Sequence, residues 1–308
     1  MNRFDSYCPD IRQLLKEQGE CFSCARVETG SDSGMGLVDR YVKYPLRLKF
    51  VSWLKHNGIY DFLLRTHVLT GWFDEFRRYW VGELGNRPVN IHDFYFLQNL
   101  YRMKFQDLGL DVEEGYDLHL KTWQSHKTVY LLFQSQFRHR GDDFSRYMRF
   151  IKKGARVLEY GCGIAPVTAW LSSYTPHLKL RLSFADIATL NFHYARWRLR
   201  EKPFAKAIEI NPDDDFPLAE SYDAIFLFAV LEHLPRPMRT VEHLFDKLNL
   251  GGCLIFDYVK SEGKGLDSMA ALHERDKVLK WLSGKLEVID GELRPPFDKL
   301  STIVCRKK

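Results

Sequence analysis

Hydrophobic positions follow two different periods along this chain of 308 residues. From Tyr41 to about Phe150 they recur every three to four residues, as a helix with one buried face requires. From Ala155 onward, short apolar runs alternate with amphipathic segments, a pattern typical of alternating strands and helices. The sequence therefore predicts a mostly helical N-terminal domain followed by an α/β domain.

The α/β part is predicted to form a seven-stranded, mainly parallel sheet, because alternating strand and helix units wind into such sheets with the ligand at the carboxyl edge. A turn over Gly291–Pro296 takes the place of a helix before the last strand, so this strand is predicted to run antiparallel. The predicted strands are Arg156–Tyr160, Leu178–Ala185, Ala207–Ile210, Asp223–Val230, Cys253–Tyr258, Leu286–Ile289 and Leu300–Cys305. The predicted helices are Val167–Ser173, Thr189–Arg200, Met238–Leu248 and Asp267–Leu282.

Three domains are predicted: a flexible polar segment over 1–40, a helical domain over 41–150 and a ligand-binding domain over 151–308. Cys21 and Cys24 form a CxxC pair without a second pair at ligand spacing, so unpaired thiols are preferred over a zinc site. The helical domain carries four of the seven tryptophans. Two interpretations of its aromatic residues remain open: a packed bundle, or rings that line an apolar substrate pocket or a homodimer contact.

Composition excludes several classes of protein. With 45% hydrophobic and 28% charged residues the chain is typical of globular proteins. A net charge of +5 does not by itself call for nucleic acid, and the basic residues Arg196, Arg198, Arg200 and Lys202 alternate along a predicted helix as a solvated face does. The longest apolar run, Ala224–Leu231, is far shorter than the roughly 20 residues of a membrane span. The first residues carry no apolar signal core, so a cytoplasmic location and free thiols are expected.

The strongest local motif is the stretch Arg156–Pro166, in which a short buried strand ends in an acid and two glycines spaced by one. Strand, glycine turn and helix together let the backbone approach a nucleotide-like ligand. A dinucleotide turn needs a small residue at the position of Pro166, and no Gly-Lys-Ser/Thr follows for a Walker loop. Both of those ligand classes are therefore disfavoured.

The stretch instead resembles the first motif of class I S-adenosylmethionine-dependent methyltransferases, with Ala165 in place of the third glycine. Further motifs follow in the family's order. Asp186 ends the second strand, Tyr222–Leu234 is similar to the fourth strand with its Val-Leu-Glu-His-Leu continuation, and Leu248–Phe256 is similar to the Gly-Gly turn into the fifth strand, with Asn249-Leu250 replacing Lys-Pro. The resemblance covers about half of the chain, from Ala155 to Cys305.

The resemblance implies a Rossmann-like methyltransferase sheet and S-adenosyl-L-methionine as cofactor. It implies that Asp186 accepts the ribose hydroxyls and that a polar residue after the third strand meets the adenine. Glu159 either orients the ammonium group of the cofactor or holds the amides of the turn. The residues implied in cofactor binding are Glu159, Tyr160, Gly161, Cys162, Gly163, Asp186, Ile187, Asn211, Asp213, Phe228 and Ala229.

The expected reaction is methyl transfer to an O or N nucleophile of a small, apolar or aromatic molecule, selected by a lid within Tyr116–Phe150. If a general base is required, His233 is the first candidate and His126 the second. His193 is expected on a solvated helix surface. The alternatives are an RNA or protein methyltransferase, and a non-catalytic interaction module that has kept the fold. No metal is predicted.

Overall fold

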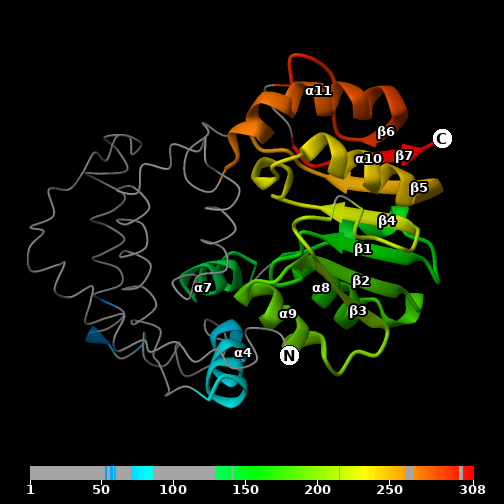
Figure 1. Cartoon of the computed structure of the whole chain (residues 1–308). Helices are drawn as coiled ribbons and strands as arrows, with labels where there is room; N and C mark the ends of the chain where they lie inside the picture. Colours follow the sequence, from blue (N-terminus) through cyan, green and yellow to red (C-terminus); the bar gives the residue numbers. More distant parts are fainter. Residues whose placement is uncertain are drawn as a thin grey trace, which may run out of the picture. The chain divides into compact units, whose positions relative to one another are not determined.

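The computed structural model describes residues 71–85, 129–139, 142–214, 216–260, 267–297 and 301–308, with isolated positions among 53–59. The chain divides into two compact units, one formed by Ser6–Leu100 and the other by Met1–Asp5 with Tyr101–Lys308. Figure 1 shows the seven strands of the second unit as one twisted sheet. Within the described residues, no helix is both long and apolar enough to span a membrane.

The sheet has the strand order β3-β2-β1-β4-β5-β7-β6. Strands β1 to β5 pair in parallel, whereas β7 runs antiparallel to both β5 and β6. The predicted seven-stranded sheet with an antiparallel last strand is therefore confirmed. The strands are β1 (Arg156–Tyr160), β2 (Arg181–Ile187), β3 (Ala205–Ile210), β4 (Tyr222–Leu227), β5 (Leu248–Phe256), β6 (Leu286–Asp290) and β7 (Ile303–Lys307).

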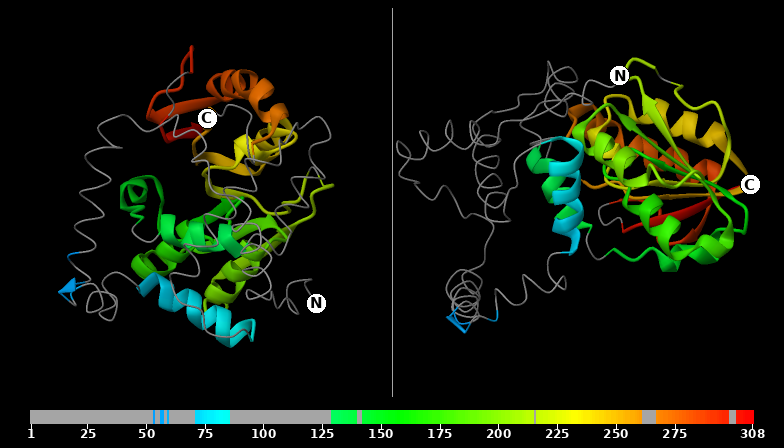
Figure 2. Two further views of the ribbon diagram at one scale, coloured as in Figure 1. Left: turned by 90° about the vertical axis from the view of Figure 1, so that its left-hand side faces the viewer. Right: turned by 90° about the horizontal axis from the view of Figure 1, so that it is seen from below.

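Helices cover both faces of the sheet, as Figure 2 shows. Successive residues of a strand point to opposite faces, so Val157 packs toward η5 and α8 while Leu158 packs toward α10 and α11. A smaller cluster joins α8 and α9 to β2 through Phe184 and Phe192. The helical elements of this unit are α7 (Val129–Arg138), η5 (Ser145–Phe150), α8 (Pro166–Tyr174), η6 (Pro176–Leu178), α9 (Leu190–Leu199), η7 (Leu231–His233), α10 (Pro237–Lys247) and α11 (Met269–Lys285).

Element boundaries differ from the sequence prediction at a few strand ends. β2 begins at Arg181 rather than Leu178, because Pro176–Leu178 forms a 3-10 turn that ends at Lys179 with a φ of 50°. β5 begins five residues early, at Leu248, and its pairing with β4 shifts register between Tyr222 and Ala224. Pro166 opens α8 as predicted, since its missing N–H has no partner to lose at the first helical position.

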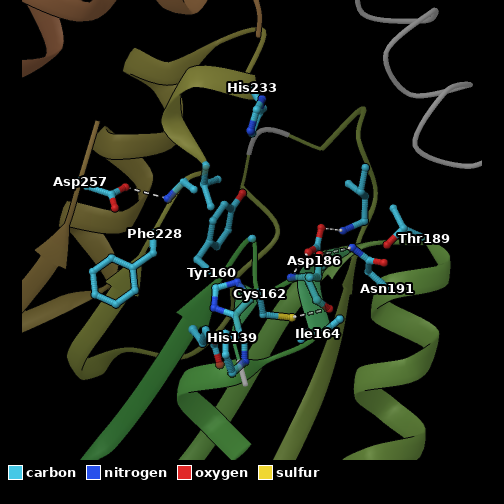
Figure 3. A pocket seen from close by; sticks show the side chains of 18 of the residues that line it. His139, Tyr160, Cys162, Ile164, Asp186, Thr189, Asn191, Phe228, His233 and Asp257 are labelled. Carbon is cyan, nitrogen blue, oxygen red and sulfur yellow. Dashed lines mark hydrogen bonds between the residues drawn. The ribbon is translucent and has the colours of Figure 1, made fainter. Parts of the chain in front are cut away.

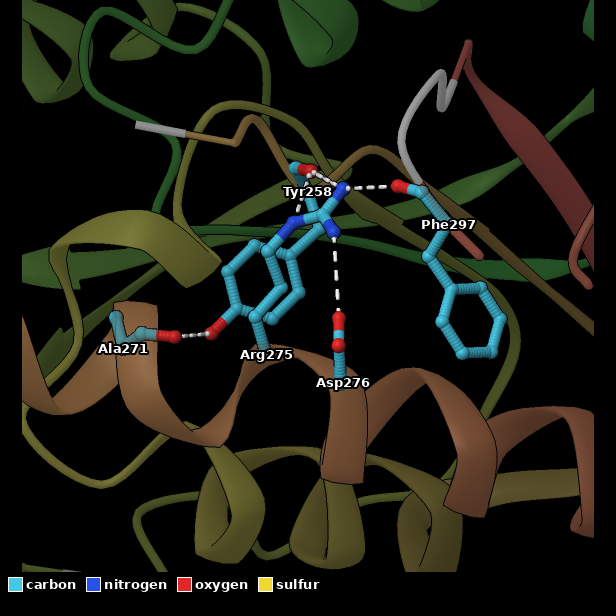
Figure 4. Close-up of polar contacts among 5 residues, drawn as sticks. All are labelled: Tyr258, Ala271, Arg275, Asp276 and Phe297. Carbon is cyan, nitrogen blue, oxygen red and sulfur yellow. Dashed lines mark hydrogen bonds and ion pairs between the residues drawn. The ribbon is translucent and has the colours of Figure 1, made fainter. Parts of the chain in front are cut away.

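A buried arginine holds the C-terminal part of the sheet together (Figure 4). The side chain of Arg275 on α11 donates to the carbonyl oxygen of Tyr258 from Nε at 3.2 Å and from Nη2 at 3.0 Å, and to that of Phe297 at 3.1 Å. The hydroxyl of Tyr258 in turn donates to the carbonyl oxygen of Ala271 at 2.6 Å. The chain after β5, α11 and the loop before β7 are thereby joined at one point.

In the first unit the described residues form α4 (Gly71–Arg78), which continues into a π-helical turn η2 (Tyr79–Glu83). The aromatic face predicted here is buried: Phe76 stacks on Phe73 and on Trp80, at centroid distances of 6.1 and 5.7 Å. The CxxC pair, His126 and most of the predicted helical domain lie outside the described residues, and the predicted domain boundaries remain predictions.

Candidate functional site

A cavity of about 720 Å³ opens at the carboxyl edge of the sheet (Figure 3). The loops that follow all five parallel strands contribute to its wall, as expected where the strand order reverses around β1 and β4. α7 and the segment leading into η5 add a further wall, so described residues of the predicted lid segment 116–150 do line the cavity. Its volume is within the range of small-molecule and cofactor sites.

The two glycines of the turn are required for different reasons. Both have left-handed backbones, with φ values of +63° at Gly161 and +52° at Gly163. A Cβ on Gly161 would lie 2.5 Å from Cγ2 of Val230, so the loops after β1 and β4 can approach only without a side chain here. A Cβ on Gly163 would meet nothing within 4 Å. Gly163 therefore leaves the backbone bare where the cavity opens, which fits the close approach of a ligand.

Ala165 adopts the same left-handed conformation, with a φ of 52°, and is fully buried. It stands at the position of the third glycine in the motif, so the chain tolerates a Cβ there at the cost of some backbone strain, about 1 kcal/mol. The N–H of Ala165 donates to the carbonyl oxygen of Cys162 at 2.7 Å, which closes the turn.

Glu159 binds the backbone that follows the glycine turn. Its carboxylate accepts hydrogen bonds from the backbone N–H groups of Val167 at 3.1 Å and Thr168 at 2.7 Å, at the start of α8. Of the two roles left open by the sequence, the structure shows the one in which Glu159 holds backbone amides. Burial raises the pKa of this carboxyl to about 7, although the two amides favour the charged form.

Asp186 joins the end of β2 to the glycine turn. Its Oδ2 accepts the N–H of Gly163 at 2.6 Å and its Oδ1 accepts the N–H of Ile187 at 2.8 Å. Burial raises its pKa to about 6, against the effect of these amides. A carboxylate held at this edge can accept further hydrogen bonds from ligand hydroxyl groups, because each oxygen has two lone pairs.

The residues after β3 are arranged differently from the sequence prediction. Pro212 and Asp214 line the cavity, whereas Asn211 and Asp213 are absent from its wall. The physical reason is a local turn: the side-chain oxygen of Asn211 accepts the N–H of Asp213 at 3.1 Å, and its carbonyl accepts the N–H of Asp214 at 2.9 Å. The amide of Asn211 is thus engaged by its own loop.

Asp257, at the carboxyl end of β5, is a cavity residue that sequence reasoning missed. Its Oδ1 accepts the N–H of Ala229 at 2.6 Å and so holds that residue in a left-handed conformation, with a φ of 50°. Figure 3 shows it on the opposite side of the cavity from Asp186. Its position in the sequence could have identified it, because this acid directly follows the apolar strand segment Cys253–Phe256.

The histidines are distributed around the cavity. His233 lines it and pairs with Asp267, with 3.2 Å between Nδ1 and Oδ1. His139 lines the opposite side, where it pairs with Asp142 at 2.5 Å. His193 was predicted to be solvated, which is wrong: it is 5% exposed, because the part of α9 that carries it is buried on nearly all sides.

An aromatic cluster forms part of the cavity wall. Phe144 stacks on Phe228 with ring centroids 6.2 Å apart, and Tyr147 contacts both Phe228 and Phe226 at 5.8 and 5.7 Å. Phe144, Tyr147 and Phe228 line the cavity, so this part of its wall is apolar. The sequence analysis named Phe228 individually, and it placed Phe144 and Tyr147 only within the predicted lid segment Tyr116–Phe150. The residues predicted from sequence that do line the cavity are Glu159, Tyr160, Gly161, Cys162, Gly163, Asp186, Ile187, Phe228, Ala229 and His233.

Comparison with known proteins places these features in a family. The sequence model described as "Methyltransferase domain" matches residues 133–299, more than half of the chain. A malonyl-[acyl-carrier protein] O-methyltransferase of Paenibacillus sp. (strain JDR-2) is 30% identical over 105 residues, which is 33% of this chain and 37% of that protein. A protein of the same description from Ilyobacter polytropus is 26% identical over 119 residues, 39% of this chain and 43% of that one.

The matched region thus spans about two fifths of the length of these curated relatives. Among solved structures, a TehB-like S-adenosylmethionine-dependent methyltransferase from Corynebacterium glutamicum aligns with a TM-score of 0.42 at 18% identity, over 59% of this chain and 98% of that one.

Proposed function

The chain belongs to the family of methyltransferase domains, and on that premise we propose that it is an S-adenosylmethionine-dependent enzyme that methylates an O or N nucleophile of a small molecule. The observation that carries the proposal is the bare backbone at Gly163, open to the cavity and joined to the carboxylate of Asp186 at 2.6 Å. A nucleoside ligand needs this combination: backbone that can be approached closely, with an acceptor for its hydroxyl groups beside it.

The residues around the turn fit the cofactor. The backbone from Tyr160 to Gly163 would hold its amino-acid part, Asp186 would accept hydrogen bonds from its ribose, and Ile187, Ile210 and Pro212 would enclose its base. When bound, the cofactor supplies a methyl group on a positively charged sulfur. The chain contributes by holding cofactor and acceptor side by side at the carboxyl edge of the sheet, where most of the acceleration arises from positioning.

The aromatic wall supports an apolar or aromatic acceptor. Phe144 and Tyr147 are almost fully buried behind the half-buried Phe228, and together the three residues give the cavity an apolar wall against which such a molecule can pack. Charges in the lining have mixed sign, with Arg138, Arg146 and Arg236 interspersed with four aspartates other than Asp186, namely Asp142, Asp143, Asp214 and Asp257. This mixture does not form the continuous basic surface that an RNA substrate requires.

Calorimetry with S-adenosylmethionine and S-adenosylhomocysteine tests the cofactor assignment. We expect saturable binding by the wild-type chain and at least a tenfold loss of affinity in Asp186→Ala, since a hydrogen bond to a charged group contributes about 1.5–3 kcal/mol. Urea unfolding of the same variant is the control, because Asp186 also holds the turn. Absence of heat with either ligand in the folded wild type would refute the enzyme and leave an interaction module.

A further inference from the structure

We propose that His139 is the general base of the methyl transfer, that Asp142 positions its ring, and that the acceptor is a phenol. The inference rests on the proposed methyltransferase function and deepens it by naming the class of acceptor. Nδ1 of His139 and Oδ2 of Asp142 are joined by a hydrogen bond of 2.5 Å. Both residues line the cavity at the carboxyl edge of the sheet, where Figure 3 shows His139.

The pair is held by the backbone on both sides of it. The N–H of His139 donates to the carbonyl oxygen of Ser135 at 2.9 Å, as in the preceding helix α7. The N–H of Asp142 donates to the carbonyl oxygen of His139 at 3.4 Å, so backbone and side chain join the same two residues. Directly downstream, Asp143 accepts hydrogen bonds from the N–H and the hydroxyl of Ser145, both at 2.9 Å, at the start of η5. Asp142 thus lies between two hydrogen-bonded turns, which keep its carboxyl group beside the ring.

The hydrogen bond between the side chains determines which nitrogen of the ring can accept a proton. A carboxylate only accepts hydrogen bonds, so Nδ1 of His139 is the donor and carries the proton of the neutral ring. Nε2 is then the accepting nitrogen, as in other histidines whose Nδ1 is bonded to a carboxylate. When a proton arrives at Nε2, Asp142 stabilises the imidazolium that forms. The side chain of His139 is 32% exposed and lines the cavity, so a ligand there can contact it.

The wall beside the pair favours an aromatic acceptor. Phe144 and Tyr147 belong to the same segment as Asp142, and with the half-buried Phe228 they form the apolar wall of the cavity. The ring of a phenol can pack against this wall while its hydroxyl meets a polar group. A phenol also needs a base, because its ordinary pKa of about 10 leaves it protonated at neutral pH, whereas a carboxylate acceptor has no proton to lose.

The proposed step balances in protons and electrons. The O–H bond of the phenol breaks and its proton passes to Nε2 of His139. The phenol oxygen forms a bond to the methyl carbon, and the electron pair of the S–C bond returns to sulfur. The products are an aryl methyl ether, S-adenosylhomocysteine and an imidazolium paired with Asp142, which then releases its proton to water.

Other charged groups line the same cavity. Arg138 precedes His139 on α7, Arg146 lies on η5, and Asp186 lies at the end of β2. His233, the first candidate base from the sequence, lines the opposite side and is the rival. The pH dependence of the rate would report these groups together, so the first test reads the ring of His139 itself.

The first experiment is nitrogen NMR of the full chain labelled with ¹⁵N-histidine and saturated with S-adenosylhomocysteine, with the signals of His139 assigned through His139→Gln. At a pH where the ring is neutral, we expect its proton on Nδ1. Asp142→Ala should move the proton largely to Nε2, because the carboxylate that holds it on Nδ1 is lost, and Asp142→Glu should restore it. Glu220→Gln, which removes an exposed ion pair outside the cavity wall, should leave the tautomer unchanged. A proton on Nε2 in the wild type, or the same tautomer in Asp142→Ala, would overturn the inference.

The second experiment supplies S-adenosylmethionine with a tritiated methyl group and a panel of catechol, 4-methylphenol, 2-phenylethanol, 2-phenylethylamine and benzoate. We expect label on catechol or 4-methylphenol, and a loss in kcat of at least a hundredfold in His139→Gln and about tenfold in Asp142→Ala, with little change in KM. Binding of S-adenosylhomocysteine by each variant is the control for folding.

An equal or larger loss of kcat in His233→Gln than in His139→Gln contradicts the inference, as does label on the other three compounds alone or on none of the panel. The two proposals fail in different ways. If the wild type binds no S-adenosylhomocysteine, the proposed function itself is wrong. If it binds this ligand and the ring of His139 is not oriented by Asp142, only the assignment of the base and of the acceptor is wrong.

Discussion

Replacing each glycine of the turn by alanine should separate folding from ligand binding. At Gly161 the new methyl group would lie 2.5 and 2.7 Å from the two Cγ atoms of Val230, well inside van der Waals contact. Overpacking of this kind costs about 1–3 kcal/mol, and the left-handed backbone adds about 1 kcal/mol. Alanine also lowers the conformational entropy of the unfolded chain relative to glycine, which offsets less than 1 kcal/mol of this destabilisation. We therefore expect Gly161→Ala to lower the free energy of unfolding by about 2 kcal/mol.

At Gly163 the same substitution meets no protein atom within 4 Å, so only the strain of the φ of +52° remains. Ala165 adopts that φ in the same turn, which shows that an alanine can do so here. We expect a loss of stability of about 0.5–1 kcal/mol. The methyl group would, however, occupy the space where the ligand approaches the backbone. Affinity for S-adenosylhomocysteine should fall at least tenfold.

Urea unfolding and calorimetry on the two variants give both quantities, and Gly154→Ala is the matched control. Gly154 has a φ of +75° and equally open surroundings, yet it is not part of the cavity wall. It should therefore match Gly163→Ala in stability and the wild type in affinity. Unchanged affinity in Gly163→Ala would refute the assignment of the turn to the ligand. Equal destabilisation of both turn variants would refute the steric role of Val230.

Two further predictions concern buried ionisable side chains. Arg275→Ala should lower the free energy of unfolding, measured in urea, by about 3 kcal/mol, because the buried carbonyls of Tyr258 and Phe297 lose their donors. The control variant Arg149→Ala removes an exposed ion pair with Asp290 and should lower it by less than about 1 kcal/mol. Equal losses in the two variants would contradict this reasoning. Burial raises the pKa of Glu232 from its ordinary value of 4.5 to about 8. Between pH 4.5 and pH 8 the folded chain therefore keeps a proton on this carboxyl that the unfolded chain has released. The free energy of unfolding should fall over this range by up to about 1.4 kcal/mol per pH unit. Glu232→Gln should flatten this slope when unfolding is measured at pH 5 and pH 8, and an unaltered slope would show that the carboxyl is ionised throughout.

The α/β class, the parallel sheet with an antiparallel last strand and the glycine turn after β1 could all be predicted from the amino-acid sequence. These features follow from local rules: the period of the apolar residues, a proline at a helix start and glycines at left-handed positions. The resemblance of the motifs, rather than these local rules, pointed to Asp186 and Phe228, which lie in the cavity wall at the carboxyl ends of β2 and β4.

The folded chain is needed to know which side chains share the cavity and how they are paired. The ion pair of His233 with Asp267 joins two loops that are far apart in sequence, and the spacing of the apolar residues does not predict it. The contact of Asp257 with Ala229 depends on the adjacency of β4 and β5 in the sheet. Burial of His193 depends on what α9 packs against. Local sequence specifies the backbone of a turn or a strand, whereas these contacts depend on strand order and on the packing of distant segments, which a single sequence does not display.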